Sequence, residues 1–408
     1  MKLFVNGRKD TFAILSKSIS KEDHVIWMHA ASLGEFEQGL PIIEKLKIDF
    51  PSYKILVTFF SPSGYEVKKN TSAADVVTYL PIDTLQNAKQ FIALTNPKLA
   101  IFVKVWILHA KSLKNFTHIF VQNEGSEKLL ASIQIKNTTV CGDTRLDRVS
   151  EILERDNSLT FMNNFKNGRP CFVAGSTWPE DEAILIDYIN NSPRNLKYVI
   201  APHTIKSEKI LGLAGAILKK TALLSKIDEN TINDYEVLII DNIGMLTKIY
   251  SYADIAYVGG GFATGLHNTL EPAIFGIPVI IGPNYKGFKE AEDLVHEKGI
   301  LPITDTWGFS ELMKKLLAQP ELIKQIGDIN AFYISKNKGA SIQIIAYLRE
   351  QQKSTQKDKV HPSSKDKKSE LPSTKKELLK PNETPSKKKE EKKKFSKLDT
   401  LKPVVVIP

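Results

Sequence analysis

The strongest constraint on the fold is an alternation of short apolar runs with amphipathic helical stretches between residues 25 and 350. This alternation is typical of βαβ units, in which helices cover a sheet of parallel strands. Five runs precede a crossing near residues 141–147 and five follow it, so the sequence predicts two Rossmann-like α/β domains. Ligands of such folds bind at the carboxyl ends of the strands, and we expect these ends to face a central cleft. The predicted strands are Val25–Ala30, Lys54–Phe60, Val76–Leu80, Leu99–Val103, His118–Gln122, Cys171–Ala174, Tyr198–Ala201, Glu236–Ile240, Ile255–Val258 and Pro278–Ile281.

Composition sets the predicted domain boundaries. Residues 1–150 form the first predicted domain, residues 151–350 the second, and residues 351–408 a tail. The tail is rich in Lys, Ser, Pro and Glu, so it cannot bury enough apolar surface to offset the entropy of ordering. We therefore expect it to be disordered, including the terminal VVVIP, which is too short to fold alone.

The net charge of +10 is concentrated in this tail. Residues 351–408 contain 17 Lys, no Arg and 8 acidic residues, whereas the first 350 residues contain 39 basic and 38 acidic residues. Because the tail lacks arginine and a series of interleaved aromatic side chains, nucleic-acid binding is not expected. Two interpretations stay open: a solvated tail without a function, or weak attraction to an anionic membrane surface.

Neither a membrane span nor a metal site is expected from the sequence. No apolar run approaches the roughly 20 residues of a spanning helix, and Met1 is followed by a mixed segment rather than a signal peptide. Cys141 and Cys171 lack the spacing of zinc ligands, and we predict them to be reduced core thiols. These features favour a cytoplasmic protein.

The segment VIWMHAASLGEFEQGLPIIEKLK, from Val25 to Lys47, is the first that carries chemistry. A predicted strand ends in small residues and an amphipathic helix begins, which places Glu35 beside a helix N-terminus. Two interpretations of Glu35 stay open. The Ser32-x-x-Glu35 spacing is that of a capping box, in which the carboxylate accepts a hydrogen bond from a backbone N–H. Alternatively, the carboxylate is a general base that faces the cleft.

Further candidate segments follow strands of the second domain. The segment AGSTWPEDEAIL runs from Ala174 to Leu185. Either Ser176 and Thr177 cap the helix that starts there while Glu180 and Asp181 complement its dipole, or the two hydroxyls and the free N–H groups face a phosphate or sugar. Pro202 and His203 lie just beyond the next strand end. Residues 243–245 form another turn, and residues 259–261, three glycines, allow a ligand to approach the backbone closely.

The stretch GLHNTLEPAIFGIPVIIGP, from Gly265 to Pro283, is the most informative. Asn268 to Glu271 open a predicted helix that Gly276 closes. The Asn268-x-x-Glu271 spacing fits a capping box. A carboxylate at a helix start can also hold the ribose hydroxyls of a nucleotide sugar, while the helix N-terminus faces the phosphate.

Together these segments resemble the Kdo transferases, the 3-deoxy-D-manno-octulosonic acid transferases of lipopolysaccharide assembly. The matching stretches are HAASLGEFEQGLPIIEKLK, GSTWPEDE and VGGGFATGLHNTLEPAIFGIPVIIGP, with weaker matches in HIFVQNE and GDTRLDRV. They occur in one order over about residues 4–350. The resemblance implies a GT-B fold and a glycosyltransferase that moves Kdo from CMP-Kdo to the lipid A precursor, lipid IVA. It also implies inversion at the anomeric carbon and no metal or other cofactor.

The resemblance implies roles for individual residues as well. Glu35 falls on the general base of the family, and Arg145, in GDTRLDR, on a basic residue that stabilises the transition state. The first domain would thus bind the acceptor and the second the CMP-sugar. The positions that would contact CMP are Pro202, His203, Ile243, Gly244, Met245, Asn268, Thr269, Leu270 and Glu271.

The sequence departs from the family pattern in three places. It starts at LFVNGRK without the apolar anchor, so we expect peripheral contact with the cytoplasmic face of the inner membrane. The first domain is shortened near residues 104–117, where Lys104-Val105-Trp106 lacks the acidic residue that precedes Trp in the family. The Lys-rich tail is not a family feature. Two alternatives stay open: a catalytically impaired CMP-binding relative with an incomplete acceptor domain, or another GT-B transferase that uses a UDP-sugar.

Overall fold

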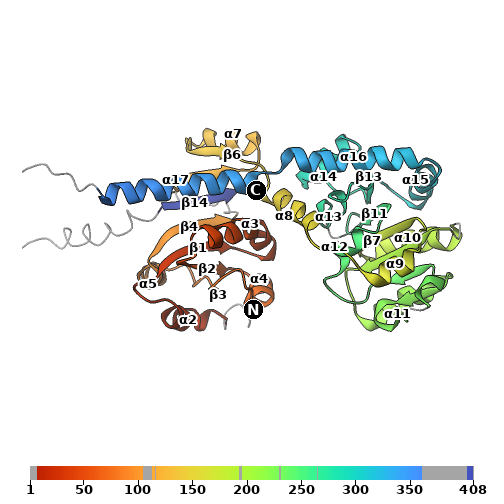
Figure 1. The fold of residues 1–408 in the computed structure, drawn as a ribbon, viewed down its shortest axis with the longest axis horizontal. Coiled ribbons are helices and arrows are strands. Elements are labelled where there is room, and N and C mark those ends of the chain that lie inside the picture. The colour runs from red at the N-terminus through yellow and green to blue at the C-terminus, as the bar shows by residue number, and fades with distance from the viewer. Residues whose placement is uncertain are drawn as a thin grey trace, which may run out of the picture. The chain divides into compact units, whose positions relative to one another are not determined.

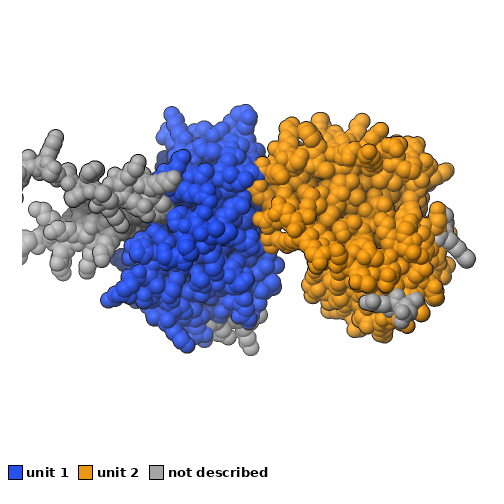
Figure 2. All heavy atoms as spheres, in the orientation of Figure 1, with its two compact units in different colours: residues 1–145, 339–408 blue, residues 146–338 orange. Residues whose placement is uncertain are grey.

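The computed structural model describes residues 7–103, 113–114, 116–192, 195–228, 231–263, 265–360 and 402–407. The chain divides into two compact units, residues 1–145 with 339–408 as unit 1 and residues 146–338 as unit 2 (Figure 2). Each unit contains one seven-stranded sheet, and all pairs of neighbouring strands are parallel. The predicted fold class, a GT-B type pair of Rossmann-like domains, is confirmed.

Unit 1 has the strand order β3-β2-β1-β4-β14-β5-β6 (Figure 1). Its strands are β1 (His24–Ala30), β2 (Tyr53–Phe59), β3 (Val76–Tyr79), β4 (Pro97–Val103), β5 (His118–Val121), β6 (Thr138–Val140) and β14 (Lys402–Ile407). Its helices are α2 (Thr11–Ser18), α3 (Leu33–Asp49), α4 (Pro62–Lys68), α5 (Leu85–Thr95), α7 (Glu124–Ser132) and α17 (Ala340–Val360). Helix α8 (Thr144–Ser150) begins in unit 1 and continues into unit 2.

Strand β1 shows why this sheet needs apolar residues on both faces. Ile26 and Met28 pack in a cluster with Ile43 of α3, on one face of the sheet. Val25 and Trp27 pack on the other face, in a cluster that includes side chains of α2 and α5. A strand covered on both faces reads as a continuous apolar run, which is the pattern that predicted it.

Helix α17 returns the chain to unit 1, although the predicted second domain extends to residue 350. Helix α17 belongs to unit 1 because four of its apolar side chains, at helical spacing, are buried in the part of the unit 1 core that contains α3. At the exposed end of this contact, the Arg349 guanidinium binds both carboxylate oxygens of Asp49, at 2.7 and 2.6 Å. The buried side chains are Ala340, Ile344, Ile345 and Leu348.

Unit 2 has the strand order β13-β12-β11-β7-β8-β10-β9. Its strands are β7 (Cys171–Thr177), β8 (Lys197–Pro202), β9 (Thr221–Leu223), β10 (Val237–Ile239), β11 (Ile255–Val258), β12 (Val279–Ile281) and β13 (Ile300–Pro302). Its α-helices are α9 (Thr160–Lys166), α10 (Pro179–Asn191), α11 (Ser207–Ala216), α12 (Leu246–Tyr250), α13 (Leu270–Ala273), α14 (Lys289–His296), α15 (Thr306–Ala318) and α16 (Pro320–Asn337). Three 3₁₀ helices complete it: η1 (Glu151–Glu154), η2 (Leu224–Lys226) and η3 (Ile232–Asp234).

All ten predicted strands are present, and four further strands are not among the predictions. Of these four, β6, β9 and β13 are strands of three residues at the edges of their sheets, and each is only partly buried, so its apolar pattern is weak. The fourth, β14, lies within the predicted tail, and residues 351–360 of the same range continue α17. Residues 361–401 lie outside the described part of the chain, as do residues 104–112 and 115, where the shortening is predicted.

None of the helices in the described ranges combines the length and apolarity needed to cross a bilayer.

The burial of α17 in unit 1 gives a testable prediction. We expect Ile344→Ala to lower the free energy of unfolding of unit 1 by about 2–4 kcal/mol, because the side chain is fully buried and its loss leaves a cavity. Ile342→Ala is the matched control, since that side chain is 65% exposed on the same helix. Chemical denaturation of both variants checks this, and equal midpoints would contradict the assignment of α17 to the unit 1 core.

Candidate functional site

Glu35 lies in the first turn of α3, directly after the turn that follows β1. Its Oε2 atom is buried and has no hydrogen-bond partner among the described residues. The same is true of Oε1 of Gln38. Residues three apart face the same side of a helix, so two unpartnered acceptors lie next to each other at the carboxyl edge of the sheet. A buried acceptor without a partner costs free energy, so each of these oxygens calls for a partner such as a ligand, an ion or a water molecule.

The capping-box interpretation of Glu35 is not realised in this structure. Ser32 is the N-cap of α3, and its side chain makes no capping hydrogen bond. Phe36 N–H donates to the backbone carbonyl of Ser32, at 3.1 Å, as in any helix start. The carboxylate is therefore not used to complete the helix N-terminus, and the positive end of the helix favours a negative charge there.

His29, the penultimate residue of β1, holds the carboxyl ends of β1 and β2 together. Its Nδ1 lies 3.1 Å from the carbonyl oxygen of Thr58 and 3.0 Å from Oγ1 of the same residue. Burial, and to a lesser extent the positive charge of the nearby Arg8, lowers the pKa of His29 to about 4. The imidazole is therefore neutral at physiological pH, with Nδ1–H as the donor to the Thr58 carbonyl.

Arg145, the predicted transition-state cation, is held by the carboxylate of Asp143. Its Nε donates to Oδ2 of Asp143 at 2.8 Å, its backbone N–H donates to Oδ1 at 2.8 Å, and Nη2 lies 2.6 Å from Oδ2. Asp143 is buried, while about a third of the Arg145 side chain is exposed. These bonds to Asp143 fix the orientation of the guanidinium.

Glu35 and Arg145 lie at the same edge of the unit 1 sheet but at different strands. Glu35 follows β1 and Arg145 follows β6, with β4, β14 and β5 between them in the sheet order. Four strand spacings correspond to roughly 19 Å between the strand ends. The structure therefore places both side chains at the carboxyl edge without a contact between them.

In unit 2, Asp181 ties three separate segments together. Its carboxylate is fully buried and accepts hydrogen bonds from Trp178 N–H at 2.9 Å, Tyr257 O–H at 2.6 Å and Gly260 N–H at 2.9 Å. Burial raises the pKa of Tyr257 far above its usual range, which keeps the phenol protonated as a donor. The N-terminus of α10 is thus capped by Asp181 and not by Ser176 or Thr177, which corrects the predicted capping residues, and Asp181 also fixes the turn after β11.

Three rings form a stack at the carboxyl edge of the unit 2 sheet. The ring of His203 lies 4.5 Å from that of Trp178 and 4.7 Å from that of His267, centroid to centroid. Trp178 Nε1–H donates to Nε2 of His267 at 2.9 Å. Burial lowers the pKa of His267, and His203 lowers it further, in keeping with an unprotonated Nε2 that accepts this bond. The predicted residue His203 is thereby joined to the segment that contains Asn268.

Glu271 joins that segment to the turn at residues 243–245. Its Oε2 accepts a hydrogen bond from the Thr247 hydroxyl at 2.7 Å, and its Oε1 accepts one from the Asn268 amide at 3.1 Å. The carboxylate thus bonds side chains rather than the backbone N–H of a capping box. Helix α12 begins directly after Met245, and Thr247 lies in its first turn. The hydrogen bond between Glu271 and Thr247 therefore brings the predicted segments 243–245 and 268–271 side by side.

The remaining predicted residues of these segments differ in exposure. Ile243 is 85% exposed, and Gly244 has a left-handed backbone with φ of 97°, which a residue with a side chain adopts only with strain. Leu270 is fully buried. Thr269 is also buried, and its Oγ1 has no hydrogen-bond partner among the described residues.

The glycines at 259–261 serve the protein backbone rather than an approaching ligand. A Cβ atom on Gly259 would lie 2.3 Å from the carbonyl oxygen of Ser176, and one on Gly260 would lie 2.2 Å from that of Gly265. Ser176 itself has a left-handed backbone, with φ of 54°. The turns after β7 and β11 therefore pack directly against each other, which corrects the expected use of these glycines.

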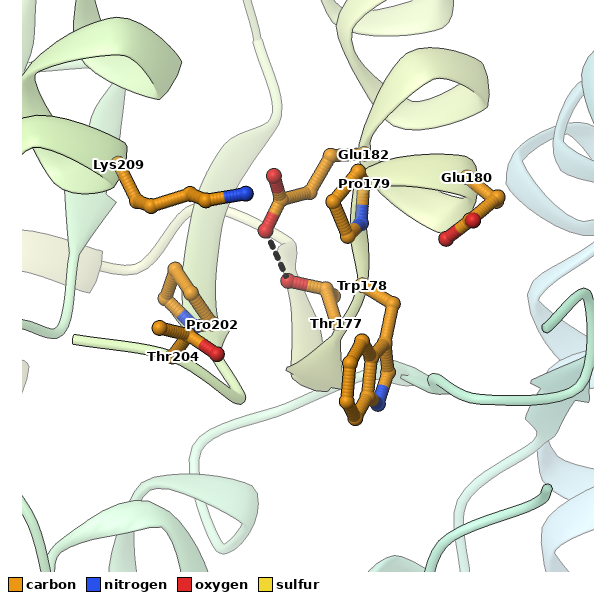
Figure 3. A pocket seen from close by; sticks show the side chains of 8 residues that line it. All are labelled: Thr177, Trp178, Pro179, Glu180, Glu182, Pro202, Thr204 and Lys209. Atoms are coloured by element: carbon orange, nitrogen blue, oxygen red, sulfur yellow. Dashed lines mark hydrogen bonds between the residues drawn. The ribbon is translucent and has the colours of Figure 1, made fainter. Parts of the chain in front are cut away.

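A pocket of about 290 Å³ opens beside the ring stack (Figure 3). Within it the Thr177 hydroxyl donates to Oε1 of Glu182 at 3.1 Å, and the Lys209 side chain extends toward the same carboxylate. Burial raises the pKa of Glu182. The pocket is lined by Thr177, Trp178, Pro179, Glu180, Glu182, Pro202, Thr204 and Lys209.

Several residues that shape these sites were not among the sequence predictions. They are Gln38 and Asp143 in unit 1, and Trp178, Thr247 and His267 in unit 2. Each lies within three residues of a predicted site residue or at the next strand end, so proximity to a strand terminus was the available signal. In the part of the chain that the structure describes, no group of three or more His, Cys, Asp or Glu is arranged to hold a metal ion.

Known proteins resemble this chain in sequence. Residues 7–108 match the family described as 3-Deoxy-D-manno-octulosonic-acid transferase (kdotransferase). A 3-deoxy-D-manno-octulosonic acid transferase of Aquifex aeolicus is 27% identical over 321 residues, covering 71% of this chain and 86% of the relative. One of Haemophilus influenzae is 27% identical over 373 residues, covering 79% and 86%. The predicted resemblance is confirmed.

A solved structure resembles the fold. The UDP-GlcNAc 2-epimerase of Neisseria meningitidis, bound to UDP-GlcNAc, aligns with a TM-score of 0.55 and 15% sequence identity. The alignment covers 80% of this chain and 100% of the epimerase chain. At this identity the likeness concerns the fold alone.

The triple hydrogen bonding of Asp181 gives a prediction for unit 2. We expect Asp181→Asn to lower the free energy of unfolding of unit 2 by about 3 kcal/mol, because an amide cannot accept all three hydrogen bonds and buries an NH₂ group among donors. Glu180→Gln, at the neighbouring exposed position, should change it by less than about 0.5 kcal/mol. Denaturant unfolding of both variants decides the matter, and equal stabilities would refute this role of Asp181.

Proposed function

We propose that this relative of the Kdo transferases is a glycosyltransferase that moves Kdo from CMP-Kdo to a lipid A precursor. The observation that carries the proposal is the buried, unpartnered carboxylate oxygen of Glu35 at the N-terminus of α3. Nothing within the described residues satisfies this oxygen, and its position is the one that the sequence resemblance assigns to the general base.

The proposed reaction is a single displacement with inversion. Glu35 accepts the proton of the acceptor hydroxyl while that oxygen forms a bond to the anomeric carbon of Kdo. The bond between the anomeric carbon and the phosphate oxygen breaks, and CMP leaves with the bonding electrons. The Arg145 guanidinium, fixed by Asp143, would stabilise the negative charge that develops on the phosphate. We propose that this chemistry requires neither a metal nor another cofactor.

Unit 2 would bind the CMP part of the donor. In support, the three predicted CMP-contacting segments are brought together: the His203 ring stacks on that of His267, and Glu271 bonds both Asn268 and Thr247. The Glu271 carboxylate would accept hydrogen bonds from the ribose hydroxyls. The buried Thr269 hydroxyl, which has no hydrogen-bond partner within the described residues, would donate to an oxygen of the nucleotide.

The proposed acceptor fixes the proposed location. A lipid A precursor is embedded in a membrane, so the protein would work at the cytoplasmic face of the inner membrane as a peripheral protein. The 17 Lys of residues 351–408 support contact with anionic headgroups, because each Lys near such a surface contributes about 1 kcal/mol.

The role of Glu35 can be tested with a variant that keeps its shape. We expect Glu35→Gln to lower the rate of Kdo transfer by at least about 100-fold, because the amide cannot accept the proton. Its affinity for CMP should stay within about twofold of the wild type, because by this account CMP binds in unit 2. Transfer assays and calorimetric titration with CMP measure the two quantities.

Glu37→Gln is the control, because Glu37 lies on the same helix but forms an ion pair with Lys68 at 2.6 Å and 38% of its side chain is exposed. It should retain transfer. Substantial transfer by Glu35→Gln would remove Glu35 from the mechanism. Loss of both transfer and CMP binding in that variant would instead indicate a misfolded protein, and circular dichroism identifies this case.

A further inference from the structure

The last residues of the chain occupy the interior of the unit 1 sheet. Strand β14 lies between β4 and β5 and is parallel to both. It pairs with β4 over five residues, from Lys402 opposite Leu99 to Val406 opposite Val103. It pairs with β5 over four residues, from Val404 opposite His118 to Ile407 opposite Val121.

Without β14, two strand edges would face each other across a gap. Neighbouring strands lie about 4.8 Å apart, so β4 and β5, two positions apart, are separated by roughly 9.6 Å and cannot pair directly. Their flanking residues are core residues: Ile101 and Ile119 are fully buried. Backbone N–H and C=O groups on these edges would lose their strand partners, and such groups are almost always paired in folded proteins. The gap is therefore a site that requires a strand.

The sequence of β14 suits a strand at this position, and no other part of the tail has such a sequence. Val404 to Ile407 are four consecutive β-branched residues, the pattern of a strand within a parallel sheet. Pro403 lacks an N–H, but it lies near the start of the strand and has a register partner only on β4. By contrast, residues 361–401 are dominated by Lys, Ser, Pro and Glu.

We propose that the C-terminal strand is a separable segment that completes the unit 1 sheet by insertion between β4 and β5 of the same chain. Strand addition of this kind uses main-chain hydrogen bonds for affinity, here on both edges. The partners are far apart in sequence, with Leu99 opposite Lys402. Unit 1 would therefore finish folding only after residues 402–407 have been synthesised. This proposal does not depend on the proposed function.

The test compares the full chain with three variants: a truncation that ends at residue 400, Val405→Pro and Val405→Ile. Val405 pairs with both Phe102 and Ile119, so a proline there removes an N–H and disturbs the strand between its two neighbours. Isoleucine keeps the β-branched character and serves as the control. The readouts are hydrogen exchange of residues 99–103 and 118–121, and the unfolding midpoint of each unit.

We expect the truncation and Val405→Pro to speed exchange in β4 and β5 by more than about tenfold and to lower the midpoint of unit 1. The midpoint of unit 2 and the behaviour of Val405→Ile should match the wild type. Addition of a peptide with the sequence of residues 401–408 should restore protection to the truncated chain, and the same peptide with the Val405→Pro change should not.

Wild-type exchange and stability in the truncated chain would overturn the proposal.

If the truncated chain does not fold, the full chain is used instead, with a protease site placed within residues 380–390 and cut after folding. The C-terminal fragment should then co-elute with the body of the protein on size exclusion, and its release with unit 1 unchanged would also overturn the proposal. Protection confined to a dimeric fraction would overturn insertion within one chain and favour a second copy as the source.

Discussion

The structure depends on one constraint, the need to pair every backbone polar group in sheets that helices cover on both faces. Ile26 and Val25 of β1 pack in different core clusters, so no water reaches the backbone between them. Parallel pairing satisfies that backbone and brings the carboxyl ends of all strands in a unit to one edge. Side chains that follow different strands, such as His203 and His267, therefore meet at that edge although they are far apart in sequence.

The carboxyl edges of the two sheets differ in how their polar side chains are paired. In unit 1, Glu35 and Gln38 keep buried oxygens without partners, which fits a group that acts on a ligand. In unit 2, the two central carboxylates are paired with other groups of the protein, since Asp181 accepts three hydrogen bonds and Glu271 two, while the buried Thr269 hydroxyl has no partner among the described residues. The hydrogen bonds of Asp181 and Glu271 hold the surface of unit 2 in shape and leave acceptor sites on Glu271 for a ligand, whereas the unpartnered carboxylate oxygen of Glu35 is available for proton transfer.

Much of the fold could be predicted from the sequence, because the ten longer apolar runs report burial directly. The rest required contacts that no local pattern contains. The spacing Ser32-x-x-Glu35 is the same for a cap and for a free base, and only the tertiary structure separates them. Tyr257 and Gly260, which donate hydrogen bonds to Asp181, lie 76 and 79 residues from it in the sequence. Four β-branched residues from Val404 to Ile407 were hidden by the average composition of the tail, and their partners are some 300 residues distant.

The most direct test of the central claim is Kdo transfer by the purified full-length protein. The assay uses a tetra-acylated lipid A precursor as acceptor and CMP-Kdo that a coupling enzyme generates in situ. A chelator that binds the metal of the coupling enzyme is added just before this protein. The account predicts that glycosylated lipid is formed in the presence of the chelator. Saturable binding of CMP without any product would contradict it and would indicate a CMP-binding relative that has lost transfer.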